Sequence, residues 1–294
     1  MSDRVLRVHS VLTARDLTLL EWLVDHGVLT SFQIAYALFP SLDFAQRRLT
    51  RLTTIGVVDR FRPFKLDGGS FPYHYVIDQL GAEVVAAQRD EPPPRPGYGR
   101  ARRRRWTSTR TIGHRLGVNG FFTDLAGHAR THPGHELVRW WPEAWCREPA
   151  AFAIEQDAIE LLVHAMPIHP DGHGIWQAGH LLVPFFLEYD TGTEPITELV
   201  RKLIGYTSLA VRGGPSWPVL FWLSSTERAV HLHQHLTELG SVRVPVATAV
   251  RDDTTNRAGP AGRVWWLHRH AGLLTLADLA VAIPHLTDQA AQTL

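Results

Sequence analysis

The chain has 294 residues, a formal net charge of +1 and an apolar share of 45%, which together predict a globular protein of about two domains. Its single cysteine, Cys146, cannot form an internal disulfide, so the composition excludes a disulfide-stapled secreted scaffold. The sequence has neither an apolar leader nor an apolar run long enough to cross a membrane, and we therefore expect a cytoplasmic protein without a membrane partner.

The first segment, residues 1–89, is predicted to be a winged-helix DNA-binding domain. Apolar residues recur at helical spacing behind Thr13, a second short helix is expected over 32–39, and a third runs from Ser41 to Gly56. Two short β runs then surround a Gly68-Gly69 turn and predict a hairpin. Three helices followed by a hairpin is the element order of a winged helix.

Basic side chains gather on the expected third helix and hairpin. Arg47 and Arg51 lie one helical turn apart and Arg48 flanks them, whereas an opposite stripe should face the core at Phe44, Leu49, Leu52 and Ile55. The hairpin adds Arg60, Arg62 and Lys65. A late helix of this kind enters the major groove, where arginine reads guanine or grips phosphate, so these residues are predicted to bind DNA. A protein-docking module with a solvated basic face is the open alternative.

Residues 90–106, DEPPPRPGYGRARRRRW, are predicted to be a basic linker. The segment has little to bury, so we expect it to be poorly ordered without a partner. Four consecutive cations would add sequence-independent affinity for phosphates, namely Arg102, Arg103, Arg104 and Arg105. A solubilising tether is an equally good interpretation.

Residues 107–294 are predicted to form an α/β domain with a mixed sheet. A helix is expected from about 109 to 129, after which strand and helix patterns alternate. The expected strands are 136–141, 159–167, 181–190, 217–224, 242–250 and 263–268. The expected helices are 194–211, 226–239 and 275–282.

Acidic residues at the end of one apolar strand form the strongest chemical signal. The run from Leu181 to Leu187 ends in Glu188-Tyr189-Asp190, and side chains two apart on a strand share a face, here about 7 Å apart. Like charges repel, so a cation between them is favourable, and oxygen ligands suit Mg²⁺ or Mn²⁺. A hairpin with the preceding strand-like segment would bring Asp171 next to Glu188. We therefore predict a metal site at Asp171, Glu188 and Asp190.

Pro170-Asp171 followed by Glu188-Tyr189-Asp190 resembles the PD-(D/E)xK nuclease pattern. More narrowly, residues 12–225 resemble the replication-relaxation family of plasmids and other mobile elements. The matching segments are TARDLTLLEWL, RRLTRL, HRLGVNGFFTDL, HPDG and FFLEYDTGTEPITELVRKLIGY. No single segment is decisive, but their order is fairly specific.

The resemblance implies a restriction-endonuclease-like core in which Asp171 and Glu188 hold the metal. The general pattern has lysine two residues after the glutamate, where this chain has Asp190. Lys202, which lies on the following helix, could supply the missing amine. The chain has only two lysines, at 65 and 202, and otherwise uses arginine, so a lysine here suggests a need for a compact ammonium group. The alternative is an exposed ion pair between Glu198 and Lys202.

Two main functions follow, and the sequence alone leaves both open. The first is a metal-dependent DNA nickase or endonuclease acting in plasmid replication or transfer, with Asp171, Glu188, Asp190 and Lys202 as catalytic residues. The second is a non-catalytic DNA-binding accessory factor or regulator with a degenerate nuclease-like domain. Double-stranded DNA is the expected partner, while other replication or transfer proteins and a homodimer stay open.

Overall fold

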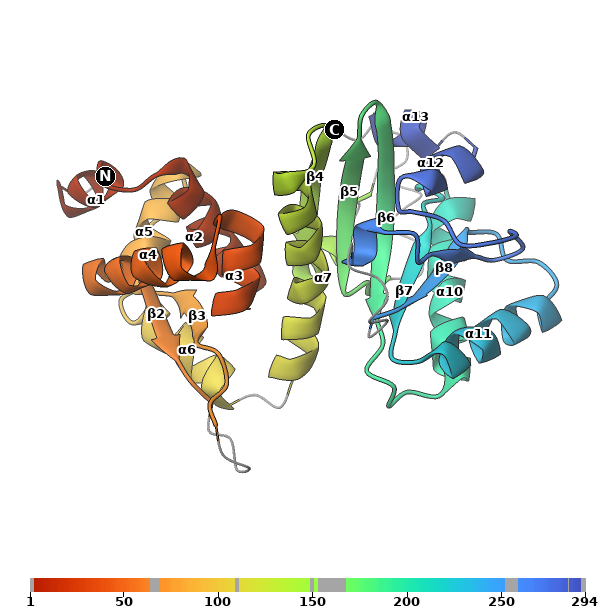
Figure 1. The fold of residues 1–294 in the computed structure, drawn as a ribbon, viewed down its shortest axis with the longest axis horizontal. Helices are drawn as coiled ribbons and strands as arrows, with labels where there is room; N and C mark the ends of the chain where they lie inside the picture. The colour runs from red at the N-terminus through yellow and green to blue at the C-terminus, as the bar shows by residue number, and fades with distance from the viewer. Residues whose placement is uncertain are drawn as a thin grey trace. The chain divides into compact units, whose positions relative to one another are not determined.

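The computed structural model describes residues 3–63, 69–108, 111–148, 151–152, 168–251, 259–284 and 286–291. It divides into two compact units, Met1–Gly127 (unit 1) and His128–Leu294 (unit 2) (Figure 1). The division falls inside one long helix, so residues 90–106 belong to unit 1 rather than lying between units. In the described part of the chain, no helix is long and apolar enough to cross a membrane.

Unit 1 contains the helices and the hairpin that the sequence predicts. The order is α1 (Asp3–His9), α2 (Ala14–His26), β1 (Val28–Thr30), α3 (Ser31–Leu38), α4 (Leu42–Ile55), β2 (Val58–Phe61), β3 (His74–Ile77), α5 (Gln79–Gln88), α6 (Tyr98–Ser108) and α7 (Ile112–Thr131). The three strands form an antiparallel sheet in the order β1-β3-β2.

Local signals explain where the first helices begin and end. Thr13 and Thr30 form capping boxes with Asp16 and Gln33, so the first free N–H groups of α2 and α3 have partners. Gly56 ends α4 in the left-handed conformation, which glycine adopts without steric cost. The core of the unit lies between these helices and the sheet, and includes Leu19, Leu20, Leu23, Ile34, Leu49 and Leu52.

Two expectations for unit 1 need correction. Phe44 was expected in the core stripe of α4 but is 58% exposed, because Ala45 takes the buried position one turn before Leu49. The expected disordered linker contains the helix α6 instead. Its Trp106 is buried against Val28, Phe61 and Val76, and this apolar contact gives the arginine-rich segment something to bury.

Unit 2 is a mixed α/β unit with a six-stranded sheet in the order β4-β5-β6-β7-β8-β9 (Figure 1). Its strands are β4 (His135–Pro142), β5 (Gly172–Ala178), β6 (Leu181–Tyr189), β7 (Val219–Leu223), β8 (Val246–Val250) and β9 (Trp266–Leu267). The β6-β7-β8 pairings are parallel and the others antiparallel. The helical elements are α8 (Glu143–Cys146), α10 (Ile196–Val211), α11 (Thr226–Glu238), the 3₁₀ helix η1 (Gly259–Ala261), α12 (Asp278–Ala282) and α13 (Leu286–Ala291).

The sequence analysis missed β5, which is the antiparallel neighbour of β6. The strand expected at 159–167 lies outside the described residues. The sequence of β5, GHGIWQA, contains two glycines and lacks the alternation of a typical strand. It is a strand because β4 and β6 supply backbone partners on both of its edges.

Candidate functional site

Glu188 lies at the buried end of β6, where the sequence analysis placed the centre of the site. The apolar run of β6 passes between β5 and β7, so the side chain at its end is removed from water and is 2% exposed. Lys202 Nζ lies 2.9 Å from Glu188 Oε2, and the Tyr206 hydroxyl donates to Oε1 at 2.5 Å. Lys202 and Tyr206 are one turn apart on α10, so one face of this helix holds the carboxylate at both oxygens.

Asp171 is the residue just before β5, and it lies beside Glu188 at the end of β6. Its N–H donates to the Leu187 carbonyl at 2.9 Å, and its Oδ2 accepts from the Tyr189 N–H at 2.7 Å. The register pairs Gly172 with Leu187, which places Asp171 beside the last residues of β6. The expected proximity of Asp171 and Glu188 is therefore present, although the hairpin that creates it begins after Asp171 rather than before it.

The charges in this cluster act on one another strongly. Burial raises the pKa of Glu188 to about 7, and the charge of Asp171 adds to the rise against the opposing effects of Lys202 and Tyr206. Burial would lower the pKa of Lys202, but the charge and hydrogen bond of Glu188, together with the charges of Asp171 and Glu194, outweigh burial and raise it. Glu188 therefore changes protonation near neutral pH beside an amine that stays charged.

Asp190 does not share this site with Glu188, which corrects the expected three-carboxylate cluster. Arg228 of α11 binds it at both oxygens, with Nε 2.6 Å from Oδ2 and Nη2 2.9 Å from Oδ1. Gly192 N–H and the Ser224 hydroxyl donate to the same carboxylate. The cation that offsets its buried charge is thus a guanidinium, and Arg251 also donates to the Asp190 carbonyl.

Of the three predicted metal ligands, Asp171 and Glu188 lie side by side at the β5–β6 pairing, whereas Asp190 is paired with Arg228. Among the described residues, no three His, Cys, Asp or Glu side chains are arranged to hold a metal ion. Mg²⁺ does not require such a cage, since it often takes one or two carboxylates and completes its shell with water and substrate phosphate. Burial, and then the charge of Asp171, raises the pKa of Glu188, whereas the charge of Asp190 is offset by Arg228.

The predicted DNA-binding arginines of α4 divide into two groups. Arg47 and Arg51 are exposed, and Arg47 forms an ion pair with Asp43 one turn earlier. Arg48 points inward: its Nε lies 2.9 Å from Oδ1 of the buried Asp16, which it ties to α4. Arg48 is therefore a structural cation, and the exposed face of α4 instead includes two polar residues that the sequence analysis missed, Gln46 and Thr50.

The hairpin and α6 place the remaining arginines. Arg60 and Arg62 both lie over the Tyr73 ring, at 4.3 and 4.0 Å from its centroid, and Lys65 lies outside the described residues. Arg102 is turned inward and donates to the carbonyls of Leu23 and Val24 at the end of α2, and Arg103 pairs with Asp59. Only Arg104 and Arg105 of the predicted basic run keep exposed side chains without a described carboxylate partner.

A family model for replication-relaxation proteins matches residues 20–220 of the chain. Comparison with curated proteins and with solved structures gave no match. The family match spans both units and includes α4, β5, β6 and α10. Because it covers more than half of the 294 residues, the chain belongs to the replication-relaxation family.

Proposed function

We propose that this protein binds duplex DNA through unit 1 and nicks or cuts it in a metal-dependent reaction at Asp171, Glu188 and Lys202. Family membership points to a role in the replication of plasmids or other mobile elements. The catalytic part rests on the contact of 2.9 Å between Lys202 Nζ and Oε2 of the buried Glu188. The charge of Asp171 also raises the pKa of this glutamate.

The arrangement suits phosphodiester hydrolysis. A Mg²⁺ or Mn²⁺ ion at Asp171 and Glu188 would supply Lewis acidity toward the phosphate and an activated water. Lys202 would offset the charge that develops on the phosphate oxygens, since its side chain is partly exposed and its ammonium stays protonated. Tyr206 is a positioning residue, because its hydroxyl holds Glu188 Oε1 from the buried side.

The same geometry accounts for the departure from the PD-(D/E)xK pattern. The residue two after Glu188 is Asp190, which serves the fold through Arg228. An amine nevertheless reaches Glu188 from α10, 14 residues further along the chain. We infer that Lys202 takes the place of the motif lysine, with the helix rather than the strand delivering it.

Unit 1 supports DNA binding by its element order and by one exposed helix face. The three helices α2, α3 and α4 followed by the β2–β3 hairpin are the order of a winged helix, which would make α4 the recognition helix. Its exposed face carries Gln46, Arg47, Thr50 and Arg51 at helical spacing. Arginine reads guanine and glutamine reads adenine from the major groove, so this face can both grip and read DNA.

The catalytic proposal is tested by nicking of supercoiled plasmid with Mn²⁺ or Mg²⁺. We expect slow nicking by the parent protein, none by Glu188→Gln, and strongly reduced nicking by Lys202→Arg, because guanidinium differs from ammonium in shape and hydration. Glu198→Gln is the matched control, since Glu198 lies on α10 but pairs with Arg201 and not with the site. A parent protein that never nicks with either metal, while binding DNA, would refute the catalytic part.

The binding proposal is tested by the salt dependence of duplex affinity. The double variant Arg47→Ala/Arg51→Ala should bind more weakly and lower the slope of log K against log salt by about 1.8, since each phosphate contact contributes about 0.9. The double variant Arg4→Ala/Arg7→Ala on α1 removes the same charge elsewhere in unit 1 and should keep the parental slope. Equal slopes for the two double variants would contradict the assignment of α4.

A non-catalytic accessory factor is the second candidate. It is favoured by the ion pair of Lys202 with Glu188, which satisfies both groups without a metal, and by the neutralisation of Asp190. On this reading unit 2 docks replication proteins, and Glu188→Gln would leave the function of the protein in plasmid maintenance unchanged.

A further inference from the structure

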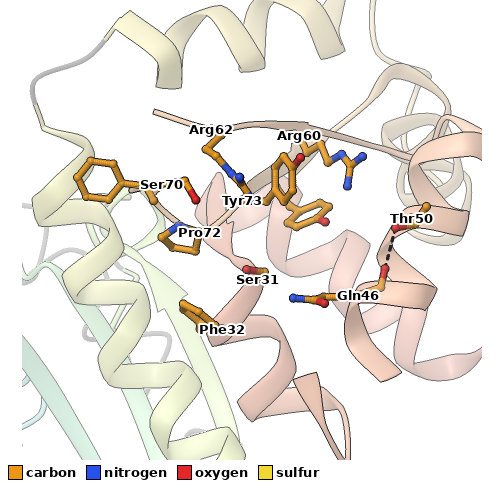
Figure 2. A pocket seen from close by; sticks show the side chains of 11 residues that line it. Ser31, Phe32, Gln46, Thr50, Arg60, Arg62, Ser70, Pro72 and Tyr73 are labelled. Atoms are coloured by element: carbon orange, nitrogen blue, oxygen red, sulfur yellow. Dashed lines mark hydrogen bonds between the residues drawn. The ribbon is translucent and has the colours of Figure 1, made fainter. Parts of the chain in front are cut away.

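Unit 1 contains a pocket that shares only Gln46 and Thr50 with the proposed duplex-binding face of α4. It has a volume of ≈370 Å³ and lies between α3, α4, β2 and the segment that leads into β3 (Figure 2). This volume is at the lower end of the range for small-molecule sites. Gln46 and Thr50 line the pocket from the exposed face of α4, so the pocket opens beside the residues proposed to enter the major groove.

The chemistry of its walls combines aromatic rings with fixed cations. Figure 2 shows Tyr73 between Arg60 and Arg62, with Phe32 and the Gln46 side chain across the pocket from them. Phe32 is 57% exposed and Phe71, which also lines the pocket, is 41% exposed. No Asp or Glu is found among the described residues that line it.

These lining residues suit a ligand that has a flat aromatic ring and a negatively charged group close to it. Exposed phenylalanine faces stack on nucleobases of any sequence, arginine guanidinium groups bind phosphate, and a glutamine amide pairs with a base edge. The stacking of Arg60 and Arg62 on Tyr73 holds both guanidinium groups at the pocket before any ligand arrives. No carboxylate among the described lining residues offsets this positive charge.

A base inside a regular duplex cannot enter, because its two faces are already covered by its neighbours. Only an unpaired or extruded base offers a free face for stacking. We propose that this pocket binds one unpaired nucleotide of DNA, so that unit 1 recognises a duplex next to a bulge or single-stranded end. This inference rests on the proposed binding of duplex DNA by α4, whose Gln46 and Thr50 belong to both surfaces.

The test measures the affinity of the full chain, in the presence of a chelator, for three DNA probes by fluorescence anisotropy. The probes are a plain duplex, the same duplex with one bulged thymine, and the same duplex with an abasic bulge. We expect the thymine bulge to bind about tenfold more tightly than the plain duplex, in line with the stacking of one base on an aromatic side chain. Phe32→Ala and Phe71→Ala should each reduce this ratio and leave the affinity for plain duplex unchanged.

Phe44→Ala is the matched control, because Phe44 is an exposed phenylalanine of α4 that does not line the pocket. It should keep the parental ratio. All three phenylalanines are exposed, so thermal melts of the variants should match the parent and show that folding is not the cause. Addition of free thymidine monophosphate should not displace the bulged duplex, and displacement would assign the pocket to a free nucleotide instead.

The remaining outcomes separate the two proposals. Equal affinity for the plain and bulged duplexes, with the expected salt dependence, overturns the pocket and leaves duplex binding intact. A preference that survives both pocket variants, or equal binding of the thymine and abasic bulges, also overturns it, since bent backbone rather than a base would then be recognised. Failure to bind any of the probes refutes the proposed duplex binding itself.

Discussion

The buried ion pair of Asp190 and Arg228 tests whether Asp190, at the end of β6, serves the fold or binds a metal. The sequence pattern assigns Asp190 to a metal, whereas the structure places both of its oxygens on one guanidinium. Its side chain is 1% exposed and that of Arg228 is 17% exposed. Removal of the arginine by Arg228→Met would therefore leave a buried carboxylate without its cation.

The expected cost follows from that burial. Breaking a buried pair by removing one partner destabilises a protein by about 3–5 kcal/mol, because the other charge stays buried. With a urea m-value of about 2 kcal/mol/M, the unfolding midpoint of unit 2 should fall by about 1.5–2.5 M. Tryptophan fluorescence reports this unit, because eight of the ten tryptophans follow Gly127, namely Trp140, Trp141, Trp145, Trp176, Trp217, Trp222, Trp265 and Trp266.

A matched control and a double variant complete the test. Arg201→Met makes the same substitution at an exposed pair with Glu198 and should shift the midpoint by less than about 0.5 M, since surface pairs contribute about 0–1 kcal/mol. Asp190→Asn/Arg228→Met should lose less than the sum of its single variants, because neither leaves the other charged. Additive losses, or a small loss for Arg228→Met, would refute the structural assignment of Asp190.

Three further predictions concern the groups around the site and α4. The pKa of Glu188 is raised from an ordinary 4.5 to about 7, so its contribution to stability is complete below pH 4.5 and is lost as pH rises through about 7. Thermal melts across this range should show that decline in the parent and not in Glu188→Gln, and a parallel dependence in both would contradict it. Tyr206→Phe removes a hydrogen bond to a charged acceptor and should cost about 1.5–3 kcal/mol in urea unfolding. It should also move the pH midpoint of Mn²⁺ binding upward, because that hydrogen bond lowers the pKa of Glu188; a lower midpoint would exclude this role. Arg48→Met should destabilise unit 1 by about 3 kcal/mol or more, since it leaves the buried charge of Asp16 without its cation. The salt slope of DNA binding should stay at the parental value in that variant, and a reduced slope would return Arg48 to the DNA-binding set.

Local sequence patterns were sufficient for much of the fold. The apolar spacing of α2 and α4, the threonine caps and the apolar run of β6 each act within one element, so they could be recognised without knowing its neighbours. The approach of Asp171 to Glu188 could also be predicted, because antiparallel pairing of neighbouring segments requires only a short hairpin.

Contacts between distant segments were decided by the tertiary structure alone. Asp190 meets Arg228 across 38 residues, Arg48 meets Asp16 across 32, and Arg102 reaches the Leu23 carbonyl across 79. A charge pattern identifies such residues as cations or anions but does not say which faces pack together, and burial then selects the partner that offsets the charge. The strand β5 has the same origin, since backbone partners on both edges outweigh a sequence with little strand preference of its own.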